Sequence, residues 1–276
     1  MDKYDHVITH DEIQKLEYQI LKAFDKFCKE NDLKYYLCGG TLLGAIRHNG
    51  FIPWDDDIDV CMLREDYDRL HDLVKNNRCL KDNSKYRFIL PLDDNYEYPF
   101  TKLVDDTTVV YEKNINKKFA IGVWVDIFPM DSWPKGDNNI KTALKKHERY
   151  KFFNKIYIAG NYRTRKEKNL GRIGKFIYSI ICHNRTSQYW VKKMLELIEP
   201  SDSNFIGNRA WPNKDRDIFD KKVFEHTLYQ KFVDQEFPIP SGYHEYLTSM
   251  YGDYMQIPKP EDRIYHDFEG YVLKKE

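Results

Sequence analysis

The stretch Phe51-Ile-Pro-Trp-Asp-Asp-Asp-Ile-Asp59 holds four aspartates directly ahead of the apolar run Val60-Cys-Met-Leu63. Residues two apart on an extended strand project from the same face, so Asp57 and Asp59 are predicted to lie side by side. The run is too apolar for an exposed loop. Neighbouring carboxylates in a half-buried strand need a cation between them, and oxygen ligands suit Mg²⁺ or Mn²⁺. We therefore predict a metal site; the alternative is a solvated acidic loop.

A glycine-rich turn, Gly39-Gly-Thr-Leu-Leu-Gly44, precedes the aspartates and is predicted to open a helix. The backbone N–H groups of Gly39, Gly40 and Thr41 would then cradle a phosphate, because a side chain at either glycine would block its close approach. The turn lacks the Lys-Ser/Thr ending of a Walker loop. Arg47 is our candidate for a phosphate clamp, since its planar fork grips two oxygens. The alternative for Arg47 is an ordinary surface arginine.

A third carboxylate, Asp126, lies within the strand predicted from Gly122 to Phe128. Counting alternate residues puts Asp126 on the same face as Trp124 and Phe128, with the aliphatic residues pointing the opposite way. A carboxylate in such a strand fits a third metal-facing group that completes the metal shell or accepts a proton. The alternative is a structural aspartate that caps the turn at Pro129.

The rest of the chain predicts an α+β fold, with a mixed sheet and flanking helices in residues 1–136 and a mainly helical extension in residues 137–276. The extension is expected to complete the active site and the acceptor side. Thr9 and Glu12 have the spacing of a capping box, so a helix should begin there. Other predicted helices cover 64–76, 140–159, 170–181, 186–198 and 243–251, and other strands cover 33–38, 87–92, 100–104 and 108–111.

The composition is that of a globular protein, with 276 residues, 15% aromatic residues and a mean hydropathy of −0.73. The five cysteines have no CxxC spacing, so neither a zinc site nor a disulfide framework is indicated, and a reducing cytoplasm fits. The start has no apolar signal core, and the apolar stretch 176–182 is too short to span a bilayer. We expect a cytoplasmic protein that does not bind nucleic acid.

The formal net charge is zero, but residues 141–175 contain twelve Lys and Arg against two Glu, a local excess of about +10. A solvated helix is the commoner explanation of such a stretch. The alternative is a surface that docks peripherally on an anionic membrane, at its inner face.

The run from Tyr35 to Val60, Tyr-Tyr-Leu-Cys-Gly-Gly-Thr-Leu-Leu-Gly-Ala-Ile-Arg-His-Asn-Gly-Phe-Ile-Pro-Trp-Asp-Asp-Asp-Ile-Asp-Val, closely resembles the signature of the LicD family of phosphotransferases. Two later stretches are similar to that family: Trp124-Val-Asp-Ile-Phe-Pro129, and Tyr251-Gly-Asp-Tyr-Met255 followed by Pro260-Glu-Asp-Arg-Ile-Tyr-His266. The resemblance spans nearly the whole chain. One departure is Tyr265-His266, where the family often has two adjacent histidines.

The resemblance implies a nucleotidyltransferase-like core in which Asp57, Asp59 and Asp126 are catalytic metal ligands behind the glycine turn. It implies transfer of phosphocholine from CDP-choline to a sugar hydroxyl of a bacterial surface glycan, such as teichoic acid, lipopolysaccharide or a capsule precursor, with release of CMP. Phosphoribitol and phosphoglycerol transferases are related. Lys102 aligns with a basic position of the family, and Arg263 and His266 belong to its tail motif, so all three are candidates for substrate or phosphate binding.

A transferred choline would need an aromatic cage for its quaternary ammonium. Trp54, Trp124, Trp133 and Trp211 are candidates, and Trp54 has the advantage of lying within the acidic motif. Two rival functions remain: a nucleotidyltransferase that releases pyrophosphate, and a catalytically inactive module that binds glycans.

Overall fold

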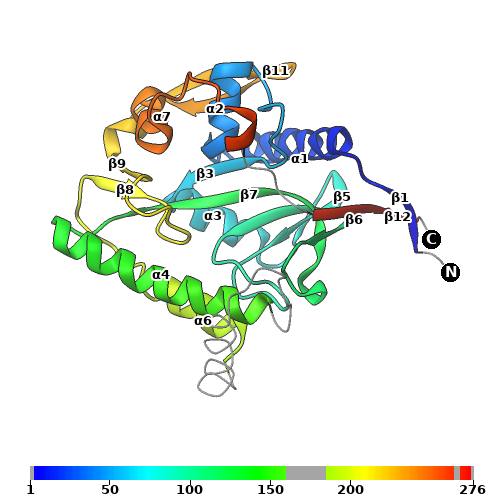
Figure 1. The fold of residues 1–276 in the computed structure, drawn as a ribbon, viewed down its shortest axis with the longest axis horizontal. Helices are drawn as coiled ribbons and strands as arrows, with labels where there is room; N and C mark the ends of the chain where they lie inside the picture. The colour runs from blue at the N-terminus through cyan, green and yellow to red at the C-terminus, as the bar shows by residue number, and fades with distance from the viewer. Residues whose placement is uncertain (1–2, 160–184, 264–267, 275–276) are drawn as a thin grey trace.

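The computed structural model describes residues 3–159, 185–263 and 268–274, and its main feature is a ten-stranded mixed sheet with helices on both sides (Figure 1). At the centre, β7 (Ile121–Ser132) pairs in parallel with β3 (Asp59–Leu63) and antiparallel with β6 (Thr101–Glu112). These three neighbouring strands carry Lys102, Asp126 and Asp59, while Asp57 lies two residues ahead of β3.

The remaining strands of the sheet extend the central three toward both edges. They are β2 (Tyr36–Leu37) beside β3, β5 (Asn83–Ile89) and β12 (Phe268–Leu273) beside β6, β4 (Cys79–Leu80) beside β5, β1 (Tyr4–Val7) beside β12, and β8 (Phe205–Gly207) and β9 (Ile218–Asp220) beyond the end of β7. Strand β12 therefore brings the carboxyl-terminal part of the chain back into the central sheet.

One face of the sheet is covered by α1 (His10–Glu30), which begins at the predicted capping box of Thr9 and Glu12. Its fully buried side chains Ile20, Leu21 and Phe24 belong to the main hydrophobic core, together with the aliphatic residues of β7. Because alternate residues of β7 face α1, the residues between them face the opposite side of the sheet. That opposite side carries the candidate site.

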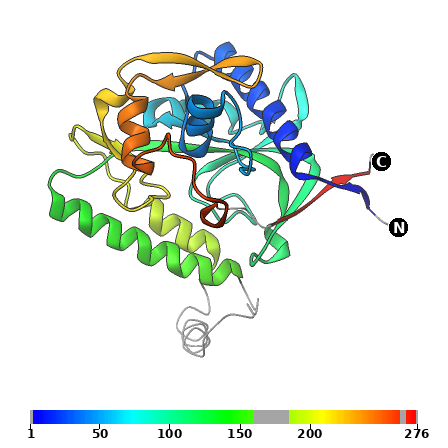
Figure 2. The same ribbon diagram turned by 45° about the horizontal axis from the view of Figure 1, so that its top comes forward.

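The other helices enclose the site from two directions. Helix α2 (Gly39–His48) lies under the antiparallel hairpin of β10 (Thr227–Phe232) and β11 (Gln235–Pro240) and beside α7 (Tyr243–Tyr251), as Figure 2 shows. Helix α4 (Asp137–Ala159) packs with α6 (Ser187–Leu195) on the side away from α1 (Figure 1). Helix α3 (Arg64–Val74) follows β3, and short 3₁₀ turns cover Lys117–Phe119, Lys221–Phe224 and Pro260–Asp262.

The predicted α+β fold, with its mixed sheet flanked by helices, is confirmed. The strands predicted at 100–104 and 108–111 form one strand, β6, with an irregular register between Asp105 and Val110. Beyond residue 136 the described chain contains strands β8 to β12 in addition to its helices. The predicted helix at 170–181 lies outside the described residues, and the boundary between 136 and 137 stays a prediction. No helix among the described residues is long and apolar enough to cross a membrane.

Candidate active site

The pairing of the three central strands places Lys102, Asp126 and Asp59 in one row across the sheet. Lys102 lies opposite Asp126 in the β6–β7 pair, and Asp126 lies opposite Asp59 in the β3–β7 pair. Residues directly opposite one another point to the same face of a sheet, so the three side chains are neighbours. The Lys102 Nζ is 2.7 Å from Asp126 Oδ1, while only 2% of Lys102 is exposed. A buried cation thus lies beside the two carboxylates.

Asp126 lies on the strand face that the alternating pattern predicted. Val123, Val125 and Ile127 are at most 1% exposed and belong to the core, whereas Asp126 is partly buried and lines a cavity with Trp124 and Phe128. The carboxylate is therefore directed away from α1 and toward space that a ligand can enter.

Asp57 and Asp59 lie at the junction of two cavities. The first, here called the aromatic cavity, has a volume of about 490 Å³ and also contacts Asp126, Lys102 and Trp211. The second, here called the helix cavity, has a volume of about 420 Å³ and lies along α2, the segment after α7 and Trp54. Since both aspartates line both cavities, a molecule that crosses the junction passes directly over them.

Repulsion among the carboxylates is visible in their acidities. Burial raises the pKa of Asp59 well above its usual range, and the charges of Asp57, Asp126 and Asp55 raise it further. Burial also raises the pKa of Asp126, although the Lys102 ammonium opposes that shift. A cation bound between these groups would relieve both effects. Within the described residues, no three His, Cys, Asp or Glu side chains converge into a ready-made metal cluster.

Sequence reasoning missed Glu17, a buried acid of α1 whose charge interacts with those of Asp57 and Asp56. Only 3% of Glu17 is exposed, and its Oε2 has no hydrogen-bond partner among the described residues. Burial raises its pKa well above the usual range, and Asp57 and Asp56 add to the shift. The sequence did contain a signal, because Glu17 interrupts the apolar stripe of α1 four residues after Ile13.

The glycine turn positions the aspartates as well as opening α2. Gly39 has a φ of +55°, and a Cβ built on it would lie 2.6 Å from Asp59 Oδ2, while a Cβ on Gly40 would lie 2.6 Å from Asp55 Oδ2. The Thr41 hydroxyl accepts a hydrogen bond of 2.8 Å from the Asp59 backbone N–H. A Cβ at either glycine would force the neighbouring carboxylate oxygen to move, and at Gly39 the positive φ adds backbone strain.

One of the three backbone N–H groups that we predicted to bind phosphate already donates a hydrogen bond within the protein. The Gly39 N–H donates to the hydroxyl of Tyr246 on α7, at 3.2 Å. The first turn of α2 also contains Gly40, which lines the helix cavity, and Thr41, which is 4% exposed. Gly40 is therefore the member of the turn that directly borders open space.

Arg47 contacts the protein itself and also lines the helix cavity. Its Nη1 donates to the carbonyl oxygens of Tyr254 at 2.8 Å and Gln256 at 3.3 Å, and its Nε donates to the His48 ring at 2.9 Å. Arg47 thus fastens the segment after α7 to α2. This contact gives Arg47 a structural task that the sequence did not predict.

Arg263 and Trp54 form a second contact in the helix cavity. The Arg263 guanidinium carbon lies 4.2 Å from the centre of the Trp54 ring, and Arg263 Nε is buried without a hydrogen-bond partner among the described residues. A buried guanidinium N–H that lacks an acceptor suits an incoming anion. His266, the remaining predicted site residue, lies outside the described residues.

The tryptophans predicted as cage candidates separate into three environments. Trp124 and Trp211 line the aromatic cavity, and Trp54 lines the helix cavity. Trp133 is fully buried in the interior and is excluded as a ligand contact. The aromatic cavity also contains residues that the sequence did not single out as cage members, namely Tyr98, Phe100 and Phe128.

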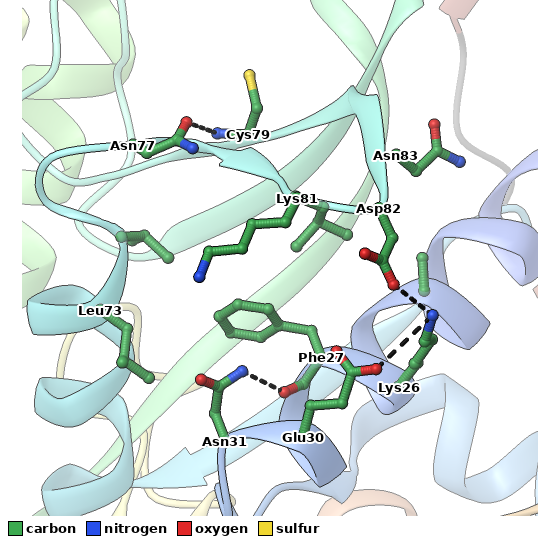
Figure 3. A pocket seen from close by; sticks show the side chains of 13 residues that line it. Lys26, Phe27, Glu30, Asn31, Leu73, Asn77, Cys79, Lys81, Asp82 and Asn83 are labelled. Carbon is green, nitrogen blue, oxygen red and sulfur yellow. Dashed lines mark hydrogen bonds and ion pairs between the residues drawn. The ribbon is translucent and has the colours of Figure 1, made fainter.

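A third cavity, of about 510 Å³, lies between α1, α3 and β4 (Figure 3). Lys26 forms ion pairs there with Glu30 and Asp82, and Phe27 and Leu73 provide apolar surface. Its charges neutralise one another, and none of its lining residues belongs to the row of Lys102, Asp126 and Asp59. Chemistry rather than size therefore favours the junction of the other two cavities as the site.

Comparisons with known proteins identify relatives of this chain. A family model described as the LicD/FKTN/FKRP nucleotidyltransferase domain matches residues 32–165, a range that contains Asp57, Asp59, Lys102 and Asp126. The lipopolysaccharide cholinephosphotransferase LicD of Haemophilus influenzae is 32% identical over 274 residues, which cover 96% of this chain and 99% of that protein.

Two further relatives match over shorter stretches. The ribitol 5-phosphate transferase FKRP of Homo sapiens is 53% identical over 34 residues, which are 12% of this chain and 7% of that protein. The uncharacterized protein RP689 of Rickettsia prowazekii is 42% identical over 57 residues, or 21% of each chain.

Proposed function

This chain belongs to the LicD family of phosphotransferases, and we propose that it transfers a phosphorylated alcohol from a cytidine diphosphate donor to a hydroxyl group of a glycan. The observation that carries the proposal is the position of Asp57 and Asp59 at the junction of two cavities. The Haemophilus influenzae relative is named as a cholinephosphotransferase of lipopolysaccharide, so CDP-choline is the donor that we propose.

Mg²⁺ is the proposed cofactor, with Mn²⁺ as its closest substitute. Magnesium sites commonly use one or two carboxylates together with substrate phosphates, so they need no cluster of three protein ligands. Asp57 and Asp59 fit this arrangement, because burial and then the neighbouring negative charges raise the pKa of Asp59, and a divalent ion would balance that charge. When bound, the ion would neutralise the diphosphate and stabilise the leaving oxygen.

The reaction needs a nucleophile aligned with the bond that breaks. The glycan hydroxyl oxygen forms a bond to the phosphorus that carries the alcohol, and the bond from that phosphorus to the bridging oxygen breaks. The electron pair leaves with CMP. Asp126, held at 2.7 Å by Lys102, lies beside Asp59, where it can complete the metal shell or accept the hydroxyl proton.

Residues of the helix cavity would bind the nucleotide side of the donor. Gly40 and Thr41 lie in the first turn of α2, where the helix dipole favours a phosphate. Arg263, whose Nε has no hydrogen-bond partner among the described residues, would bind a phosphate oxygen, and Trp54 beneath it offers a flat apolar surface to the cytosine ring. Arg47 would act on this cavity by holding the segment at Tyr254 in place.

We propose further that the enzyme works in the cytoplasm and meets a lipid-linked acceptor at the membrane surface. Four exposed basic residues of α4 would contact anionic lipid: Lys141, Lys145, Lys146 and Arg149. The part of the basic stretch from 160 to 175 lies outside the described residues. Flotation with anionic liposomes at low salt should recover the protein with the vesicles, and its absence from them would refute this docking.

Donor turnover tests the proposed function. Purified protein with Mg²⁺ and a membrane fraction of the producing organism should release CMP from CDP-choline, with mass spectrometry as the readout. Release of pyrophosphate from CTP would instead indicate a nucleotidyltransferase. CMP release from CDP-ribitol or CDP-glycerol alone would keep the reaction class and change the alcohol. Glycan binding without any nucleotide turnover would indicate the inactive module.

A further inference from the structure

One side of the aromatic cavity is a continuous wall of four rings, here called the ring wall, made of Tyr98, Phe100, Phe128 and Trp211. Ring centres are separated by 5.1 Å between Tyr98 and Phe100, by 4.5 Å between Phe100 and Phe128, and by 5.5 Å between Tyr98 and Trp211. The rings come from the loop before β6, from β7 and from the segment after β8. Three distant parts of the chain therefore converge on one apolar surface beside the carboxylates.

Cations already lie against the rings of this region. Lys102 Nζ is 3.9 Å from the centre of the Trp124 ring and 4.9 Å from that of Tyr98. On α4, Lys151 Nζ is 4.3 Å from the centre of the Trp211 ring and donates to the Pro212 carbonyl oxygen. Lys102 lies closest to the face of Trp124 and is farther from Tyr98 and Phe100, at 4.9 Å and 5.6 Å from their ring centres, so the ring wall is defined without Trp124. Lys151 supports Trp211 in its position.

The charge of the cavity lining also favours a cation. Asp56, Asp57, Asp59, Asp126 and Glu112 line the cavity, against Lys102 and Lys113. Glu112 lies beside the ring wall, since the Tyr98 hydroxyl donates a hydrogen bond to its carboxylate at 3.4 Å. A divalent ion on Asp57 and Asp59 would leave the Glu112 carboxylate in place near the rings.

We infer that the ring wall, with Glu112 beside it, binds the quaternary ammonium of the donor's alcohol and so selects choline over polyols. This inference rests on the proposed function and extends it to the residues that determine specificity. Ring faces attract a trimethylammonium group through their quadrupole, and such a group donates no hydrogen bond. Ribitol or glycerol hydroxyls need polar partners when buried, and the ring wall offers few: the Trp211 indole N–H and the Tyr98 hydroxyl, which already donates to Glu112.

Calorimetric binding of CDP-choline, CDP-ethanolamine and CDP-ribitol, with Mg²⁺ and without acceptor, tests the inference. Wild-type protein should bind CDP-choline about tenfold more tightly than either of the other donors. Trp211→Leu and Phe128→Leu should each reduce the preference over CDP-ethanolamine to roughly twofold, because the leucine keeps apolar volume and removes the ring. Retained binding of CDP-ethanolamine shows that each variant is folded.

Tyr229→Leu is the matched control, because Tyr229 is a 59% exposed aromatic residue on β10, away from both cavities. It should keep the wild-type preference for CDP-choline. A measurement on the wild type alone avoids any folding defect: tetramethylammonium chloride should displace CDP-choline more strongly than sodium chloride at the same concentration.

The outcomes separate this inference from the proposed function. Equal weakening of CDP-choline and CDP-ethanolamine in Trp211→Leu and Phe128→Leu, or tight binding of CDP-ribitol by the wild type, would overturn the ring wall as the choline site. CMP release from CDP-ribitol would still support phosphoalcohol transfer in that case. Pyrophosphate release from CTP without binding of any CDP-alcohol would overturn both.

Discussion

At the level of single residues, the site contains carboxylates that repel one another in the folded protein. Asp59 is partly buried. Burial, together with the charges of Asp57 and Asp126, raises its pKa well above the usual range. The nearby cation Lys102 is paired with Asp126. Carboxylates that repel one another in this way reduce stability unless a cation binds between them.

Asp59→Asn should therefore remove activity and stabilise the metal-free protein. Loss of one metal-binding carboxylate should lower CMP release by roughly 100-fold or more, because metal-ion stabilisation is worth several kcal/mol. The same change removes a repelled charge, so the melting temperature in EDTA should rise. Asp72→Asn, at an exposed position on α3, is the matched control and should alter neither quantity. An active Asp59→Asn enzyme would contradict the assignment.

The residue pattern predicted part of this environment. Alternation along β7 correctly placed Asp126 on the face of the strand that Val125 and Ile127 do not occupy, because a partly buried strand allows only one face for a carboxylate. Glu17 was missed, since a single acid within the apolar stripe of a helix is usually a local exception. Its significance depends on which strands lie beneath α1, and that is a tertiary fact.

At the level of elements, the turn into α2 and the segment after α7 shape the helix cavity. The turn requires glycine because Gly39 has a positive φ and approaches Asp59. The segment is attached to α2 by Arg47, whose Nη1 donates to two carbonyl oxygens. Both contacts join parts of the chain that are separated in sequence, so each can be tested by one substitution.

Gly39→Ala should reduce activity because its Cβ would lie 2.6 Å from Asp59 Oδ2 and displace that carboxylate. Gly136→Ala is a matched control: Gly136 also has a positive φ, of +85°, but no atom lies within 4 Å of the added Cβ. Both variants should lose about 1–2 kcal/mol of stability from backbone strain. Only Gly39→Ala should lose CMP release, measured at saturating donor. Equal activity of the two variants would show that the turn does not position Asp59.

Arg47→Lys should weaken the enzyme without abolishing its activity. Lysine keeps the charge but loses the planar fork, so it cannot hold Tyr254 and Gln256 as well as contact His48. We expect roughly a tenfold lower kcat/KM and faster amide hydrogen exchange in residues 252–258. Unchanged exchange and full activity would assign Arg47 to an inert surface position.

Most elements could be predicted because their signals are local, as with the capping box of Thr9 and Glu12. Their pairing could not. Asp59 meets Asp126 through a parallel pairing of strands that lie far apart in the chain, and Lys102 joins them from a third strand. No periodicity within a strand specifies its neighbour, so the charged row emerges only from the sheet.

At the level of the whole molecule, buried ionisable groups should lower the stability of the fold both as pH rises and as pH falls. Burial raises the pKa of Glu97 to about 8 and that of Asp217 to about 7. It lowers the pKa of His147 to about 3 and that of His71 to about 4. The acids destabilise the fold as pH rises from their ordinary values toward the raised ones, and the histidines destabilise it as pH falls below about 6.5.

Glu97→Gln isolates one of these groups. Below pH 4.5 both Glu97 and the glutamine are neutral, so the two proteins should have similar stability. As pH rises from about 5 to about 8, the wild type should lose stability relative to the variant, by up to roughly 1.4 kcal/mol per pH unit. Urea unfolding across this range measures the difference. A constant difference would mean that Glu97 is ionised throughout.

The two cavities are lined by parts of the chain that lie far apart in the sequence. The aromatic cavity takes Trp211 from the carboxyl-terminal half, and the helix cavity takes Arg263 from near the end of the chain. The sequence predicted Trp211 and Arg263 as candidates, but only the fold assigns them to different sides of Asp57 and Asp59. The family signature identified the carboxylates, while the division of the space around them into two cavities required the structure.

Titration calorimetry of Mg²⁺ into protein that holds CDP-choline bears on the whole account. Wild-type protein should give a saturable binding heat with one or two ions per chain, as expected for a carboxylate pair completed by diphosphate. The double variant Asp57→Asn with Asp59→Asn should give none, although its circular dichroism stays that of the wild type. Equal Mg²⁺ binding by the two proteins would contradict the account.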